Sequence, residues 1–128
     1  MLVYLSMIEP RAKPAIFLGS SKEDLREFPE DVRTEFGYAI FAAQEGGKAP
    51  KAKPLKGIIP GTGILEIVED FDRNTYRAVY TVKFAGFVYV LHAFQKKSKQ
   101  GIKTPKHEID LIRARFAEAK ADYEERKK

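Results

Sequence analysis

The stretch from Gly63 to Gln95 constrains the fold most strongly, because it reads as three consecutive strands joined by short turns. Gly63 to Phe71 is a strand with Leu65, Ile67 and Glu69 on one face and Ile64, Glu66 and Val68 on the other. In the strand from Tyr76 to Phe84 the residues alternate between two faces. One face carries Tyr76, Ala78, Tyr80, Val82 and Phe84, and the other carries Arg77, Val79, Thr81 and Lys83. Phe87 to Gln95 is apolar on both faces, which indicates a central strand. The connecting turns are Asp72-Arg73-Asn74-Thr75 and Ala85-Gly86. The pattern predicts an antiparallel meander of three strands.

The residues before the meander predict one strand and two helices. Ala15 to Leu18 is a short apolar strand. Ser20 and Glu23 match a capping box at the start of a short helix, which Pro29 ends. Pro29 also opens a second helix, closed by Gly46-Gly47. Arg33 and Glu35 on this helix face water, and its apolar residues recur at helical spacing: Val32, Phe36, Ile40 and Ala43.

A loop and a last helix complete the expected order. Lys48 to Pro60 is rich in proline and lysine and predicts a loop. Thr104-Pro105 starts a helix whose tail, Glu124 to Lys128, is expected to fray. Its apolar stripe is Ile109, Ile112, Phe116, Ala119 and Tyr123. The expected fold is α+β in the order β-α-α-β-β-β-α, with the meander packed on a helical hairpin and the last helix.

Length and composition limit the class of protein. The 128 residues are the size of one domain, and a hydrophobic fraction of 44% is enough for a core. We expect a loosely held lead-in at residues 1–14 and a single domain at residues 15–128. No apolar run approaches the length of a membrane span, and the N-terminus lacks the basic start of a signal peptide, which favours a cytoplasmic protein without a membrane partner. With no cysteine and two histidines, we expect no disulfides, thiolate chemistry, zinc cluster or cofactor.

Positive charge is concentrated in two segments. The net charge is +5, and the span from Lys96 to His107 contains five lysines and no acid. Lys48 to Lys56 contains four lysines and no acid, whereas Lys22 to Glu35 carries six acids and three bases. Two lysine clusters that face each other across a sheet favour a polyanion partner, because neutralised phosphates release counterions. The alternative is that these lysines only keep surface loops soluble, and the charge does not distinguish RNA from DNA.

Three residues of the meander are candidates for chemistry. Arg77 lies on a strand face with Glu66 on the neighbouring strand, so it either forms a structural ion pair or binds a phosphate. His92 is either a hydrogen-bonded core residue or part of a groove with Lys96, roughly 13 Å along the same strand face. Alternation along this strand places His92 on one face with these residues: Val88, Val90, Phe94 and Lys96.

The chain resembles HigB-like toxins of the RelE/ParE superfamily over about residues 15–120. The residues that carry the resemblance lie in the expected order, and the run from Phe94 to Ser98 is the most specific. They are Gly19-Ser20-Ser21, Asp24-Leu25, Phe28-Pro29, Arg33, Phe36-Gly37-Tyr38-Ala39, Ala52-Lys53-Pro54-Leu55-Lys56-Gly57, Glu66, Tyr76-Arg77-Ala78-Val79-Tyr80, Val90-Leu91-His92-Ala93-Phe94-Gln95-Lys96-Lys97-Ser98 and Thr104-Pro105.

The resemblance implies a RelE-like fold and the toxin of a type II toxin–antitoxin module. Such toxins cut mRNA on the ribosome without metal, by attack of the 2′-hydroxyl on the adjacent phosphate. On this analogy Lys96 and Lys97 lie nearest the reaction, Arg77 binds the scissile phosphate, and His92 positions or exchanges a proton. The RNA-binding lysines are Lys53, Lys56, Lys99 and Lys103. The implied partner is an antitoxin, often a helix-turn-helix protein, through which operator DNA is bound.

Two alternatives remain from the sequence. ParE-like relatives of the same fold act on DNA gyrase, and a domain of this shape also binds RNA without cleaving it. The lysine cluster from Lys96 to Lys106 favours RNA, because an inhibitor of gyrase has no need of a groove that holds phosphate.

Overall fold

The protein is an α+β structure with a five-stranded mixed sheet and three helices, and the computed structural model describes residues 12–55, 57–58, 63–96 and 104–128. The elements are β1 (Ala15–Phe17), α2 (Ser21–Arg26), α3 (Glu30–Gln44), β2 (Lys53–Pro54), β3 (Ile64–Phe71), β4 (Asn74–Thr81), β5 (Val88–Lys96) and α4 (Lys106–Lys127). The predicted α+β class and the predicted succession of elements are confirmed, with β2 as an addition.

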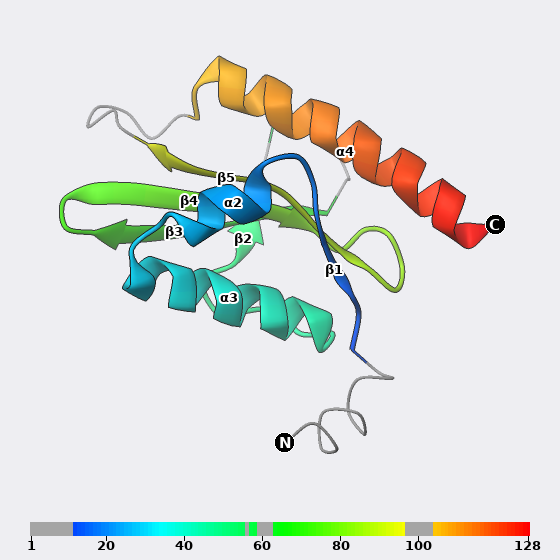
Figure 1. Ribbon diagram of the computed structural model, residues 1–128, viewed down its shortest axis with the longest axis horizontal. Coiled ribbons are helices and arrows are strands. Elements are labelled where there is room, and N and C mark those ends of the chain that lie inside the picture. Colours follow the sequence, from blue (N-terminus) through cyan, green and yellow to red (C-terminus); the bar gives the residue numbers. More distant parts are fainter. Residues whose placement is uncertain (1–11, 56, 59–62, 97–103) are drawn as a thin grey trace.

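The strands form one sheet in the order β1-β5-β4-β3-β2. The predicted meander of β3, β4 and β5 is antiparallel, whereas β1 pairs with β5 in parallel. Helices α2 and α3 cover one face of this sheet and α4 lies on the other (Figure 1). Helix α4 packs mainly against β5. On this face of the sheet, β3 and β4 are therefore less covered than β5.

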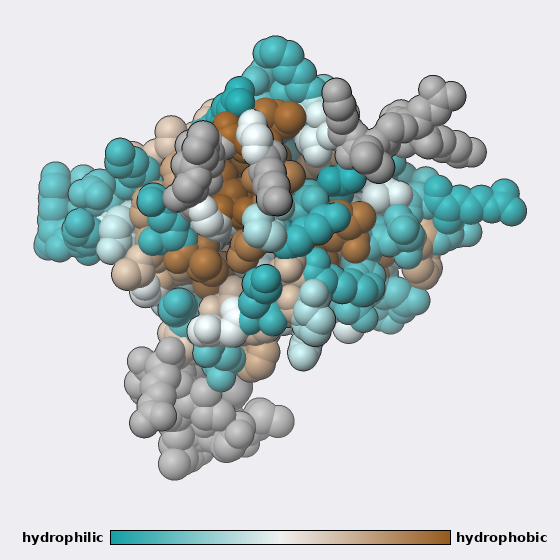
Figure 2. All heavy atoms as spheres, turned by 180° about the vertical axis from the view of Figure 1, so that it is seen from behind, coloured by the Kyte–Doolittle hydropathy of each residue, from teal (hydrophilic) through white to brown (hydrophobic). Residues whose placement is uncertain are grey.

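Each face of the sheet has its own hydrophobic core. Val32, Phe36 and Ile40 of α3 pack on one face, as their helical spacing predicts. Ile112, Phe116 and Ala119 of α4 pack on the other. Seen from the side opposite to Figure 1, hydrophobic residues reach the surface near the middle and hydrophilic residues occupy the two ends (Figure 2). Because a core lies on each of its faces, the sheet is the middle layer of three, between α3 and α4.

The two hairpins differ from expectation in where the strands end. Asp72 and Arg73 both have positive φ (49° and 69°) and form a two-residue turn, so β4 begins at Asn74 rather than Tyr76. The second turn is tight as predicted, with Gly86 at φ 87° and a Phe87 N–H to Phe84 carbonyl bond of 3.1 Å. Because β4 already ends at Thr81, Phe84 joins the α4 core and not the face of Tyr76, which corrects the prediction.

A bulge in β5 changes which side chains share a face. Val79 pairs with His92 but the next residue, Tyr80, pairs with Val90, so Leu91 is an extra residue on β5. Val88 and Val90 consequently face the α3 core, whereas His92, Phe94 and Lys96 lie on the α4 side. The predicted single face for all five residues is wrong, because strict alternation does not survive a bulge.

Two helix ends differ from expectation, the start of α2 and the end of α4. The Ser20 side chain makes no cap hydrogen bond to the backbone and donates instead to Asp24 at 2.8 Å, so the predicted capping box with Glu23 is wrong. Helix α3 ends as predicted, with Gly46 at φ 87°. Helix α4 begins just after Pro105 and continues to Lys127, which corrects the expected fraying of the tail. The predicted lead-in at residues 1–14 lies largely outside the described residues.

The segment predicted as a loop contains the short strand β2. Lys53 pairs with Glu66 and Pro54 pairs with Leu65, and the Leu55 N–H donates to the Ile64 carbonyl at 2.9 Å. Proline is tolerated here because β2 is the edge strand and needs no donor on its outer side. This short strand places Lys53 beside β3.

Two buried tyrosines predict opposite responses to the same substitution. The Tyr80 hydroxyl is buried without a hydrogen-bond partner among the described residues, whereas the Tyr89 hydroxyl donates to Asp122 at 2.7 Å. Removing an unsatisfied hydroxyl relieves a desolvation cost, so Tyr80→Phe should stabilise the protein by about 1 kcal/mol. Tyr89→Phe should destabilise it by about 1 kcal/mol. Urea unfolding of both variants measures the difference, and a loss of stability in Tyr80→Phe contradicts this account.

Candidate functional site

Three charged side chains meet on the sheet face that carries α4. Val68, Arg77 and Phe94 are direct neighbours across β3, β4 and β5. Glu66 lies two residues before Val68, and Lys96 lies two residues after Phe94, on the same face. The strand register therefore brings Glu66, Arg77 and Lys96 to one face of the sheet.

Glu66 is the centre of this charged cluster. Its Oε2 accepts a hydrogen bond from Arg77 Nη1 at 2.9 Å, and its Oε1 lies 3.8 Å from Lys53 Nζ. The side chains of Arg77 and Glu66 are 10% and 7% exposed, whereas that of Lys53 is 62% exposed. The cluster thus consists of a buried ion pair, Arg77 with Glu66, and the exposed Lys53 beside it.

Lys96 is the third member of the cluster and is itself buried. Burial lowers the pKa of Lys96 below its ordinary value, the nearby Arg77 lowers it further, and Glu66 opposes both. A lysine in such surroundings gives up its proton more readily than an exposed one. Arg77, Glu66 and Lys96 therefore combine a fixed cation, a carboxylate and a potential proton donor.

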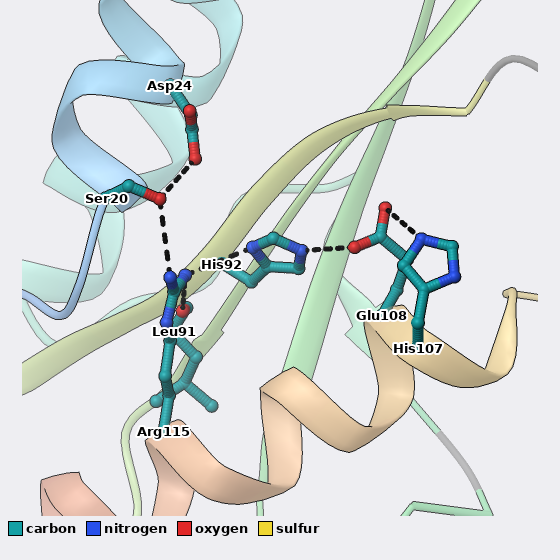
Figure 3. A network of polar contacts seen from close by, with 7 residues as sticks. All are labelled: Ser20, Asp24, Leu91, His92, His107, Glu108 and Arg115. Atoms are coloured by element: carbon teal, nitrogen blue, oxygen red, sulfur yellow. Dashed lines mark hydrogen bonds and ion pairs between the residues drawn. The ribbon is translucent and has the colours of Figure 1, made fainter.

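His92 belongs to a second polar group, between β5 and α4 (Figure 3). Its Nε2 lies 2.7 Å from Glu108 Oε1, and its Nδ1 lies 3.2 Å from Arg115 Nη1. Arg115 also donates to the Leu91 carbonyl at 3.0 Å and to the Ser20 hydroxyl at 3.3 Å. This polar network joins α4 to the bulge of β5 and to the start of α2.

The neighbours of His92 fix its protonation state. An arginine only donates, so His92 Nδ1 accepts from Arg115, and the ring proton on Nε2 is donated to Glu108. Burial lowers the pKa of His92 below 6.5; Glu108 and more distant Asp24 oppose this shift, while Arg115 adds to it. Both ring nitrogens are occupied by protein groups, which is the arrangement of a hydrogen-bonded structural histidine.

A surface hollow of about 420 Å³ lies beside His92, on the side of α2. Its lining includes Asp24 and Glu27 together with Tyr76 and Phe94, and no cation. An acidic hollow repels phosphate. The cluster of Glu66, Arg77 and Lys96 therefore suits an RNA backbone better than the hollow beside His92 does.

The chain matches the model of a known protein family. Residues 23–117 match the family described as Phage derived protein Gp49-like (DUF891), which is most of the chain. The protein belongs to the Gp49-like family. This family is of the RelE/HigB type and is associated with the toxins of toxin–antitoxin systems, and it implies a cognate antitoxin partner. No curated protein matches the chain.

The family match spans both polar groups of the Gp49-like protein. Residues 23–117 contain the cluster of Glu66, Arg77 and Lys96 and all of the His92 network except Ser20. The predicted residues Lys97, Lys56, Lys99 and Lys103 lie outside the described residues.

None of the helices that the structure describes is long and apolar enough to cross a bilayer.

Sequence reasoning missed two residues of the Gp49-like protein, Glu108 and Arg115. They stand seven positions apart on α4, which is two helical turns, and so lie on the same side as Ile112. Ile112 and Ala119 belong to the core-facing stripe of α4. Glu108 and Arg115 lie within or beside this stripe. Polar residues inside an apolar stripe were the available signal.

The depressed pKa of His92 predicts a pH dependence of stability. The unfolded chain takes up a proton near pH 6.5, but folded His92 resists it, so stability is full above that pH and is lost as the pH falls through the lower pKa of the folded state. His92→Gln should remove this loss. His107→Gln, at a side chain that is 80% exposed and 3.8 Å from Glu108, should retain it. Urea midpoints between pH 7.5 and 5 measure both, and an unchanged pH profile in His92→Gln would mean that another group causes the loss.

Proposed function

We propose that this Gp49-like protein is the HigB-like toxin of a type II toxin–antitoxin module and cleaves mRNA on the ribosome. The observation that carries the proposal is the cluster of Glu66, Arg77 and Lys96 on the sheet face that α4 covers mainly at β5. A buried ion pair adds little net stability compared with apolar residues of the same size. Its position beside a buried lysine is better explained by use in chemistry than by stability.

The reaction needs only groups that the cluster contains. The Glu66 carboxylate takes the proton from the 2′-hydroxyl, whose oxygen then bonds to the adjacent phosphorus. Arg77 holds the phosphate oxygens and neutralises the charge that develops on them. The bond from phosphorus to the 5′-oxygen breaks, and Lys96 supplies the proton to that oxygen. The products are a 2′,3′-cyclic phosphate and a 5′-hydroxyl, and no metal ion takes part.

The ion pair sets a condition on substrate binding. Arg77 Nη1 donates to Glu66 at 2.9 Å, so a phosphate that binds Arg77 competes with Glu66 for it. Release of Glu66 leaves its carboxylate ready to accept a proton beside the bound phosphate. The exposed Lys53, 3.8 Å from Glu66, attracts the RNA backbone to the cluster.

The remaining assignments complete the proposal. Lys97 assists Lys96, and Lys56, Lys99 and Lys103 contact the RNA backbone. His92 acts through position, because it fixes α4 and the bulge of β5 next to Phe94. Residues 15–128 form the toxin domain behind a lead-in of residues 1–14. The antitoxin is a helix-turn-helix protein that links the cytoplasmic toxin to operator DNA.

The test compares RNA ends with DNA topology after induction of the protein. The proposal expects new mRNA ends within translated regions, 5′-hydroxyl termini on the fragments, and unchanged DNA topology. Purified ribosomes carrying an mRNA should be needed for cleavage. Intact transcripts with accumulated gyrase–DNA breaks would support a ParE-like inhibitor of gyrase instead. RNA binding without new ends would support a non-catalytic domain.

A further inference from the structure

A hollow of about 510 Å³ is lined by residues of β1, α2 and α3, of which α2 and α3 lie in front of the sheet in Figure 1. Its floor is apolar and comes from all three elements: Ala15, Phe17, Leu25 and Ile40. We call it the β1 groove. It lies on the α3 side of the sheet, whereas Arg77 and Lys96 face the α4 side. The β1 groove is therefore separate from the proposed nuclease site.

The rim of the β1 groove is positive although the segment around it is negative. Lys22 to Glu35 contains six acids and three bases. All three bases, Lys22, Arg26 and Arg33, line the groove, and none of the six acids does. Within the described part of the chain, none of these three bases forms an ion pair. The fold thus gathers the cations of an acidic segment around one apolar hollow.

Strand β1 presents a free edge at this groove. Among the residues that the structure describes, it stands at the end of the sheet and pairs only with β5. The Pro14 carbonyl accepts from Val88 and the Leu18 N–H donates to Val90, so alternate residues of β1 bond to β5. The backbone groups of Ala15 and Phe17 consequently point away from the sheet, and their side chains line the groove. Gln44 bonds to Lys13 and so ends the free edge at 13.

We propose that the β1 groove binds an extended segment of a partner protein in which apolar and acidic residues alternate. Such a segment adds a short strand to β1 through the outward groups of Ala15 and Phe17, and its apolar side chains fill the floor. Its acidic side chains pair with Lys22, Arg26 and Arg33. A nucleic acid matches the cations but offers no backbone amides to the strand edge. The inference stands whether or not the protein cleaves RNA.

The test uses fluorescently labelled ten-residue peptides that contain alternating valine with glutamate, lysine or serine. Anisotropy should show that the full chain binds the glutamate peptide at least tenfold more tightly than the serine peptide and does not bind the lysine peptide. The double change Arg26→Glu and Arg33→Glu should weaken binding of the glutamate peptide at least tenfold. The matched reversal of exposed bases elsewhere, Lys83→Glu with Lys120→Glu, should not.

The strand edge has its own variant. Ala15→Pro removes an outward N–H but no hydrogen bond to β5. It should weaken binding of the glutamate peptide several-fold, while the melting temperature of the protein stays within a few degrees of the wild type. Arg77→Gln with Glu66→Gln should bind the peptide like the wild type, which separates this result from failure of the nuclease proposal.

Three results would overturn the inference. The first is equal affinity of the three peptides, or no binding at millimolar concentration. The second is tighter binding of a ten-nucleotide oligouridylate that the Arg26 and Arg33 reversals abolish, which makes the groove a nucleic-acid surface. The third is a dimer in light scattering that the same reversals dissociate, which makes the groove an interface between copies of this chain.

Discussion

Replacing Arg77 by glutamine, together with Glu66→Gln, should lower the rate of mRNA cleavage on purified ribosomes by at least 10³-fold, a loss of about 4 kcal/mol in transition-state stabilisation. The pair then keeps a side-chain hydrogen bond in place of the ion pair, which is 2.9 Å in the wild type, and no buried charge is left unpaired. Loss of one donor to a developing oxyanion alone costs about 10²- to 10³-fold. Removal of the base adds a further factor.

Single variants assign the two roles. Arg77→Lys keeps a positive charge but loses the planar fork, so it should retain part of the activity. Lys96→Met keeps the length of the buried stem, and it should lower the rate by about 10²-fold and remove the alkaline limb of the pH profile. That limb should lie below the ordinary range of lysine, because burial and Arg77 lower the pKa of Lys96. Full activity in the double glutamine variant, with an unchanged melting temperature, would exclude the cluster as the site.

The outline of the fold was readable because its signals are local. The alternating faces of Tyr76 to Phe84, the proline and glycine that bound α3, and the apolar stripe of α4 each depend on residues close in sequence. Tertiary contacts decided the details that were wrong. Ser20 resembles a cap, but its hydroxyl is engaged by Asp24 and by Arg115, ninety-five positions away. No local pattern contains that partner.

The bulge at Leu91 explains the main error about the candidate site. Periodicity of two predicts that Val88 and His92 share a face, yet one extra residue turns His92 toward α4. Phe94 and Lys96 share a face with His92 as expected, because all three follow the bulge, and Arg77 lies directly across from Phe94. Glu66 joined them through the register of β3 with β4, which sequence reasoning had used only to suggest an ion pair.

The edge strand β2 shows a different limit. It is only two residues long and contains a proline, so composition alone favours a loop. Its position beside β3 depends on the free edge that the meander leaves there. Lys53 was expected to contact RNA from a loop, and the strand instead holds it 3.8 Å from Glu66.

Gly19→Ala should destabilise the protein by about 3 kcal/mol, because the residue combines two constraints. Its φ of +52° is unfavourable for alanine, at a cost of about 1 kcal/mol. A Cβ built there would lie 2.5 Å from Arg115 Nη2. Arg115 is held by the Leu91 carbonyl and His92, so it moves aside only by giving up charged hydrogen bonds worth about 2 kcal/mol.

Two comparisons separate the clash from the general cost of changing a glycine. Gly37→Ala, in the middle of α3 with nothing within 4 Å of the added Cβ, should stabilise the protein by up to about 1 kcal/mol. In an Arg115→Lys background the guanidinium is gone, so Gly19→Ala should then cost only about 1 kcal/mol. Urea unfolding of the four members of the Gly19–Arg115 cycle gives the coupling energy. A coupling near zero would mean that Arg115 does not pack over Gly19, and the network joining α4 to the start of α2 would have to be redrawn.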